Sequence, residues 1–139
     1  DTGIFRGMFA GKDDCTIYVV KVPLRNIVYK TVVCLPTRDT WDWLEKDYNE
    51  FKDMLTSKYG EPLQHSETFK AGVFTSSDYL KISALKEGKC DYHSSWGLNE
   101  GFIILEIFNA DGSSDCCVRL SYYDAINYKL AQDSKQNDL

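Results

Sequence analysis

Five cysteines, at positions 15, 34, 90, 116 and 117, are the residues of this sequence with the widest choice of chemistry. A thiolate can act as a nucleophile, a metal ligand or a redox group when its surroundings favour ionisation. The number of cysteines is odd, their spacing is irregular and no C-x-x-C pair occurs, so no disulfide framework is indicated. We expect most of them to be buried thiols that pack as small apolar side chains. An exported protein could still form one bridge among them.

Two short patterns supply the remaining candidate site residues. Cys90 and His93 form a C-x-x-H pair, which is half of a zinc ligand set. Residues three apart on a strand point to opposite faces, however, and no second close pair of ligands exists. The stretch 109–115 resembles part of a calcium-binding loop, but the twelve-residue pattern and its final Glu are missing, so a hairpin loop is favoured. We therefore predict no catalytic, cofactor or metal site, and only Cys90, His93, Asp111 and Asp115 stand as candidates.

The adjacent cysteines are best explained as strand residues. If 111–114 form the loop of a hairpin, Phe108 lies opposite Cys117 and Glu106 lies opposite Arg119. Successive side chains of a strand point to opposite faces, so Cys116 should join an apolar face and Cys117 should lie beside Arg119. A disulfide between the two neighbours is excluded by this alternation.

The overall charge argues against a nucleic-acid partner. The chain has 16 basic and 21 acidic residues, a net charge of −5, and no cluster of Lys and Arg. Phosphate contacts need concentrated positive charge, so we expect no nucleic acid among the partners. No apolar run approaches the ~18 residues that cross a bilayer, so we also expect no membrane span.

A long amphipathic helix is predicted over residues 41–59. Its apolar residues recur in steps of three and four, which is the spacing of a single helical stripe. Asp39 or Thr40 can cap its first turn, and Gly60 followed by Pro62 ends it. The stripe consists of Trp41, Leu44, Tyr48, Phe51, Leu55 and Tyr59.

The remaining predicted elements are strands. Residues 3–11 indicate an irregular edge strand with a bulge, and residues 15–23 and 26–36 indicate a β-hairpin. Four later segments are joined by short turns and should form an antiparallel meander, namely 78–85, 90–96, 101–109 and 116–124. The predicted fold class is α+β, with an antiparallel sheet, made of the N-terminal hairpin and the four-stranded C-terminal meander, packed against one long helix.

The domain organisation allows two descriptions. Residues 1–131 form a single α+β domain, or residues 1–36 end one module and residues 37–131 form a complete second one. Residues 132–139 are polar, and we expect a frayed tail there.

Short motifs spread along nearly the whole chain resemble those of one known family. They lie at residues 7–11, 15–18, 41, 44, 51–52, 58–62, 101–105, 118–124, 127 and 138–139. Together they resemble a family of small uncharacterised exported proteins of Bacteroides-type gut bacteria. The resemblance implies helix-plus-antiparallel-sheet modules similar in architecture to β-lactamase-inhibitor-protein-like folds. It also implies a periplasmic or extracellular location after removal of a signal peptide. The N-terminal helical segment usual in such proteins is not found here, and the family carries no catalytic residues to transfer.

Two classes of function follow. The favoured one is a non-enzymatic exported domain that binds a protein or an envelope component through its sheet, because a sheet backed by a helix leaves one broad face available. The alternative is a small-ligand-binding protein or small enzyme with a pocket between helix and sheet, built from Cys90, His93 or buried carboxylates. We expect no cofactor, and the oligomeric state is left open.

Overall fold

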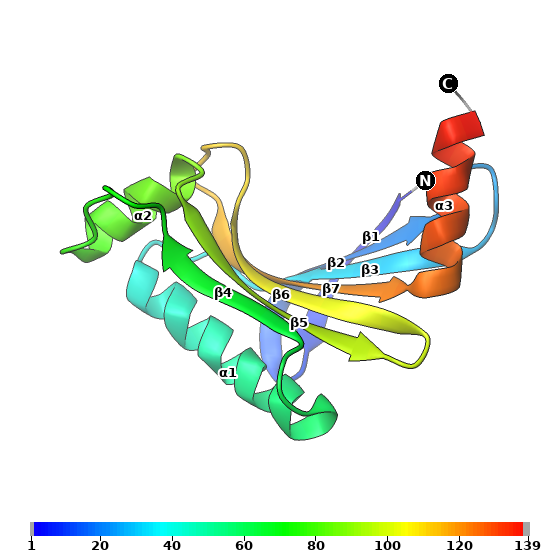
Figure 1. The fold of residues 1–139 in the computed structure, drawn as a ribbon, viewed down its shortest axis with the longest axis horizontal. Helices are drawn as coiled ribbons and strands as arrows, with labels where there is room; N and C mark the ends of the chain where they lie inside the picture. The colour runs from blue at the N-terminus through cyan, green and yellow to red at the C-terminus, as the bar shows by residue number, and fades with distance from the viewer. Residues whose placement is uncertain (1, 138–139) are drawn as a thin grey trace.

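The computed structural model describes residues 2–137, with the side chains of residues 2–135. Seven strands and three helices follow one another along this part of the chain. All seven strands join in one antiparallel sheet with the spatial order β1-β2-β3-β7-β6-β5-β4 (Figure 1). The elements are β1 (Thr2–Phe9), β2 (Lys12–Lys21), β3 (Val28–Cys34), α1 (Trp41–Tyr59), β4 (Gln64–Phe69), α2 (Asp78–Lys86), β5 (Cys90–Leu98), β6 (Gly101–Asn109), β7 (Cys116–Asp124) and α3 (Ala125–Asn137).

The helices lie on both sides of the sheet. Helix α1 packs against β5, β6 and β7 on one face. Helix α3 packs against β3, β6 and β7 and rises on the other side of the sheet, at the end where β7 finishes (Figure 1). None of the helices in residues 2–137 is long and apolar enough to cross a membrane.

The predicted helix over 41–59 is confirmed as α1. The Thr40 side chain caps it by accepting a hydrogen bond from the backbone N–H of Trp43. The Asp78 carboxylate, from the start of α2, accepts two more bonds, from the N–H groups of Trp41 and Asp42. At the other end Gly60 has φ 89°, as its predicted role requires, and its N–H donates to the Thr56 carbonyl.

The core lies between α1 and the sheet. The helix contributes the predicted stripe, of which every member except Tyr59 is buried. The sheet contributes buried apolar side chains that alternate along β6 and β7. Two polar groups in this core are satisfied internally, since Tyr48 is hydrogen-bonded to Ser94 at 2.6 Å and the Trp96 indole donates to the Gly60 carbonyl at 2.9 Å.

Several predicted features of the sheet are confirmed. The hairpin between β2 and β3 forms, and β1 is an edge strand whose register shifts between Gly7 and Phe9. The register predicted for 101–109 against 116–124 is also correct, with Cys117 opposite Phe108 and Arg119 opposite Glu106.

The segment 78–85 was predicted to be a strand, and this is wrong because it forms most of α2. Ser77 caps the helix by accepting from Leu80 N–H, and Lys86 lies in its last turn. Ile82 and Leu85, three residues apart, both join the core. A short apolar run is compatible with the residue spacing of a strand or of a helix. Here the helix forms because it buries this pair beside α1.

The four-stranded meander is therefore a three-stranded one, and β4 completes this side of the sheet. β4 pairs with β5 at the second edge of the sheet. Its sequence, QHSETF, is too polar for the alternation that identifies a half-buried strand.

The C-terminal segment is more ordered than the predicted frayed tail. Helix α3 begins at Ala125, and residues 132–137 continue it. Residues 138–139 of the predicted tail, which also belong to the family resemblance, lie outside the described residues.

A charged cluster links the N-terminal hairpin to α1. The Asp47 side chain is fully buried, and Arg38 donates to both of its carboxylate oxygens at 2.8 and 3.2 Å. Lys12, at the start of β2, lies 3.7 Å from Asp47 and 3.2 Å from Glu50. The cluster places the hairpin, the segment before α1 and the helix itself in one packed unit.

Candidate functional site

The sheet face opposite α1 carries a row of charged, hydroxyl, imidazole and thiol side chains. We call it the open face, because only α3 packs on it among the helices described, and only at one end. A row of polar residues crosses this face from edge to edge, each directly opposite the next on the neighbouring strand. In spatial order the row is Arg6, Thr16, Cys34, Arg119, Glu106, His93 and Ser66.

The centre of this row is held by an ion pair. Two guanidinium nitrogens of Arg119 donate to Glu106, at 3.1 and 3.2 Å. The same guanidinium lies 3.6 Å from the centre of the Phe108 ring, a cation–π contact. The predicted position of Glu106 opposite Arg119 is confirmed, and their ion pair holds the Arg119 side chain beside Cys117 on the same face.

A hollow of about 510 Å³ opens beside this ion pair. It is lined by residues of β1, β2, β3, β6 and β7 and lies at the end of the sheet opposite α3. Its walls include Arg6, Tyr18, Asp14 and Asp115, and both Cys34 and Cys117 line it. Two thiols, a guanidinium and a phenol therefore share one water-accessible space.

The two thiols are diagonal neighbours on the open face. Cys117 is buried and Cys34 is partly exposed. A hydrogen bond with the Cys117 thiol lowers the pKa of Cys34 to about 7, and the Arg119 charge acts in the same direction against the effect of burial. The same hydrogen bond, together with burial, raises the pKa of Cys117. Cys34 is thus the sulfur of the pair that ionises near neutral pH.

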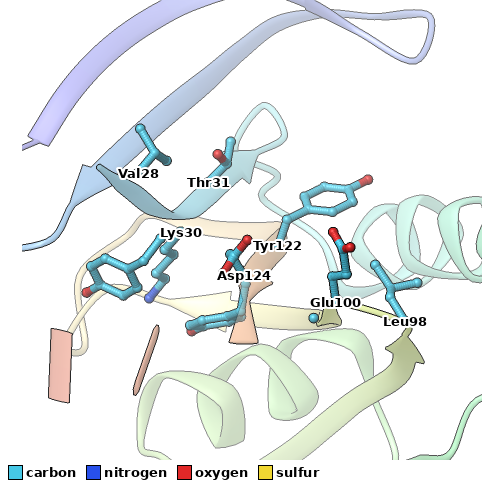
Figure 2. Close-up of a pocket in the computed structure, with 10 residues that line it drawn as sticks. Val28, Lys30, Thr31, Leu98, Glu100, Tyr122 and Asp124 are labelled. Atoms are coloured by element: carbon cyan, nitrogen blue, oxygen red, sulfur yellow. The ribbon is translucent and has the colours of Figure 1, made fainter. Parts of the chain in front are cut away.

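A second hollow, of about 280 Å³, lies near α3 (Figure 2). Figure 2 shows Lys30, Glu100 and Asp124 at its margin. The Asp124 carboxylate accepts from the N–H of Asn127, so it caps α3, and the Lys30 ammonium lies over the Tyr123 ring at 4.9 Å. These contacts give Asp124 and Lys30 structural roles and leave the hollow near the two thiols as the stronger candidate.

The edge strand β1 exposes large apolar side chains on both of its faces. Ile4 is 64% exposed, Phe5 is 58% exposed and Met8 is 67% exposed. Ile4 shares the open face with Arg6, and Phe5 points to the opposite face. The outer edge of β1 has no neighbouring strand in the described sheet.

Cys90 and His93 lie on opposite faces of β5, as their spacing predicted. Burial raises the pKa of Cys90 to about 12, and the charge of Asp91 adds to this effect. The His93 Nδ1 lies 2.6 Å from the Asp91 carboxylate on the open face. The pair therefore shares no site.

Asp111 and Asp115 lie in the loop between β6 and β7, as predicted. Asp111 adopts φ 48°, and the amide of Asn109 organises the loop by accepting from Gly112 N–H and donating to the Ser113 carbonyl. Asp115 also lines the hollow that contains the two thiols. Within residues 2–137, no group of three or more His, Cys, Asp or Glu side chains is arranged to hold a metal ion.

Sequence reasoning missed Cys34 and Cys117 as partners. They are 83 positions apart by their numbering (117 − 34), and only the pairing of β3 with β7 brings them together. The sequence does show, from the alternation along each strand, to which face each cysteine points. That signal identifies the two as neighbours only once the pairing of β3 with β7 is known.

Comparison of the chain with models of protein families, with curated proteins and with solved structures gave no significant match.

Proposed function

We propose that this protein binds an extended segment of a partner protein along the edge strand β1. The exposure of Ile4, Phe5 and Met8 carries the proposal. Burial against a partner would remove these apolar side chains from water, and all three lie along one strand whose outer edge is unpaired in the described sheet. The proposal keeps two expectations from the sequence, that the protein is exported and that it catalyses no reaction.

The chemistry of β1 favours addition of a strand. Edge strands are usually protected by charge, by Pro or by a covering element. β1 has one charged side chain, Arg6, and its bulge lies only at the end near Phe9. A partner strand would hydrogen-bond to the free backbone groups of this edge, and alternate apolar side chains would contact Ile4 and Phe5 on the two faces.

The charge of β1 restricts the partner further. Arg6 lies between Ile4 and Met8 in the sequence and is the single charge of the strand. We expect the partner segment to place an acidic side chain opposite Arg6, where the pair would be only partly screened by solvent.

The experiment is selection of peptides from a displayed random library, with affinities then measured by calorimetry. Selected peptides should alternate in hydrophobicity, include an acidic residue and slow hydrogen exchange of the outward-facing β1 amides. Phe5→Lys should weaken their binding at least about tenfold, the loss expected when a large apolar contact is replaced by a charge. Phe74→Lys is the matched control, because Phe74 is 78% exposed but lies outside the sheet, and it should leave binding unchanged.

Three outcomes would overturn the proposal. One is a failure to enrich any peptide, and another is a set of peptides whose binding is insensitive to Phe5→Lys. The third is self-association through β1, detected as a dimer in sedimentation and abolished by Phe5→Lys, which would make the partner a second copy of this chain.

A further inference from the structure

We propose that Cys34 and Cys117 form a redox-active thiol pair that exchanges with small-molecule disulfides and closes reversibly into a cross-strand disulfide. Cys34 is the attacking sulfur and Cys117 is the resolving sulfur. This site lies on the open face and goes beyond the binding function proposed for β1, with which it shares Arg6 as a wall of the hollow.

The register of β3 against β7 places the two thiols together. Cys34 is directly opposite Arg119, so Cys117 is its diagonal neighbour on the same face. Beyond Cys34, the N–H of Leu35 donates to the Val118 carbonyl and the N–H of Arg38 donates to the Cys116 carbonyl. The chain therefore stays beside β7 for a few residues beyond the end of β3, which keeps Cys34 next to Cys117.

The shared face and the shared hollow make a bridge between the two cysteines accessible. Both side chains lie on the open face as diagonal neighbours and line the same hollow, so closure needs side-chain rotation and a local movement of the backbone. A diagonal pair departs from the spacing that disulfides prefer, and strained disulfides are more easily reduced. The bridge should therefore open again when a thiol reductant is added.

The surroundings separate the roles of the two thiols. Cys34 is partly exposed in the hollow, and its pKa is lowered to about 7, so much of it is thiolate at neutral pH. Cys117 is buried and its pKa is raised, mainly by the hydrogen bond to Cys34. Once Cys34 is part of a mixed disulfide, it is no longer a thiolate that accepts a hydrogen bond from the Cys117 thiol. The Arg119 charge then favours ionisation of Cys117.

The exchange is balanced in two steps. The Cys34 thiolate attacks one sulfur of a disulfide R–S–S–R, which forms Cys34–S–S–R and releases R–S⁻, and this thiolate takes up the proton that Cys34 had lost. Cys117, after losing its proton to solvent, attacks the Cys34 sulfur, breaks the mixed disulfide and releases the second R–S⁻, which is protonated in turn. Both cysteines are oxidised to one disulfide, and R–S–S–R is reduced to two R–SH.

The other cysteines provide internal controls. Cys90 is also partly exposed, but burial raises its pKa to about 12. Burial also raises the pKa of Cys15, and Cys116 lies in the core. Cys34 and Cys90 are both partly exposed, so an oxidant that reacted according to exposure alone would modify both. Faster reaction of Cys34 would therefore reflect its lower pKa.

The test treats the native protein with oxidised glutathione at neutral pH and maps the products by mass spectrometry. Cys34 should react about 100-fold faster than Cys90, because its far larger thiolate fraction is offset in part by lower intrinsic nucleophilicity. The wild-type product should be the Cys34–Cys117 disulfide, with the loss of two hydrogens. Cys117→Ser should accumulate the mixed disulfide at Cys34, Cys34→Ser should leave Cys117 unmodified, and Cys90→Ser should behave as wild type.

Several results would overturn the inference. They are equal reactivity of Cys34 and Cys90, a mixed disulfide at Cys34 that persists in the wild type, or a bridge that includes another cysteine. The rate comparison uses the wild-type chain, so it decides the question even if a Ser variant fails to fold. Equimolar zinc that blocks labelling of Cys34, with no disulfide formed by glutathione, would reassign the pair to a soft metal.

Discussion

Replacing Arg38 with Ala should destabilise the protein more than replacing its partner Asp47 with Ala. The two side chains form a bidentate ion pair, with Lys12 as a more distant third member. The pair is asymmetric, because the Asp47 side chain is 0% exposed whereas that of Arg38 is 26% exposed. Each substitution therefore leaves a different group without its partner.

The magnitudes follow from that asymmetry. Arg38→Ala leaves a buried carboxylate with only Lys12 at 3.7 Å, and an unpaired buried charge costs about 3–5 kcal/mol. Asp47→Ala leaves two cations that can turn toward water, so its cost should be that of the lost charged hydrogen bonds, about 1–3 kcal/mol. The double variant should lie close to Asp47→Ala, so the coupling energy should equal the cost of Arg38→Ala, about 3–5 kcal/mol.

The assay is urea unfolding followed by tryptophan fluorescence and circular dichroism. Lys89→Ala removes an exposed ion pair with Glu87 and serves as the control, with an expected change below about 0.5 kcal/mol. Arg38→Ala costing less than Asp47→Ala would refute the assignment of Asp47 as the buried member that depends on Arg38. The two probes should also give one coincident transition, whereas separate transitions would favour residues 1–36 as part of a distinct module.

Three further predictions concern the core, the sheet and metal binding. Leu55→Ala should destabilise by about 2–5 kcal/mol in urea melts, and a change below ~0.5 kcal/mol would show that the α1 stripe is not core. Gly101→Ala should cost at least about 2 kcal/mol, because a Cβ there would collide with the Tyr123 carbonyl, whereas Gly7→Ala meets no atom within 4 Å and should cost less in the same melts. Equimolar zinc should leave the melting temperature unchanged, and a rise of several degrees that chelator reverses and His93→Ala abolishes would contradict the absence of a zinc site.

The elements that sequence predicted well are those fixed by neighbouring residues. Helix α1 is specified by its stripe, by the Thr40 cap and by the glycine at 60, all within one continuous stretch. The register of β6 against β7 follows from a short loop and strict alternation, which leave one pairing that buries a single apolar face. Local chemistry was sufficient in both cases.

Where the sequence-based prediction failed, the local pattern does not decide between two structures. The run at 78–85 can serve as strand or helix, and the choice was made by burial of Ile82 and Leu85 beside α1. β4 has little apolar pattern of its own and exists because β5 offers it a free edge. In both segments the deciding free energy comes from contacts with distant parts of the chain.

The candidate site also depends on contacts between distant parts of the chain. The composition and the alternation within β7 determined that Cys117 faces away from Cys116 and lies beside Arg119. Only the antiparallel pairing of β3 with β7 decided that Cys34 lies next to Cys117, and that their shared hollow opens on the uncovered face of the sheet. Sequence fixes which way a strand residue points, because that depends on the backbone alone, but the neighbour it meets depends on which strands find each other, and that is set by burial over the whole sheet.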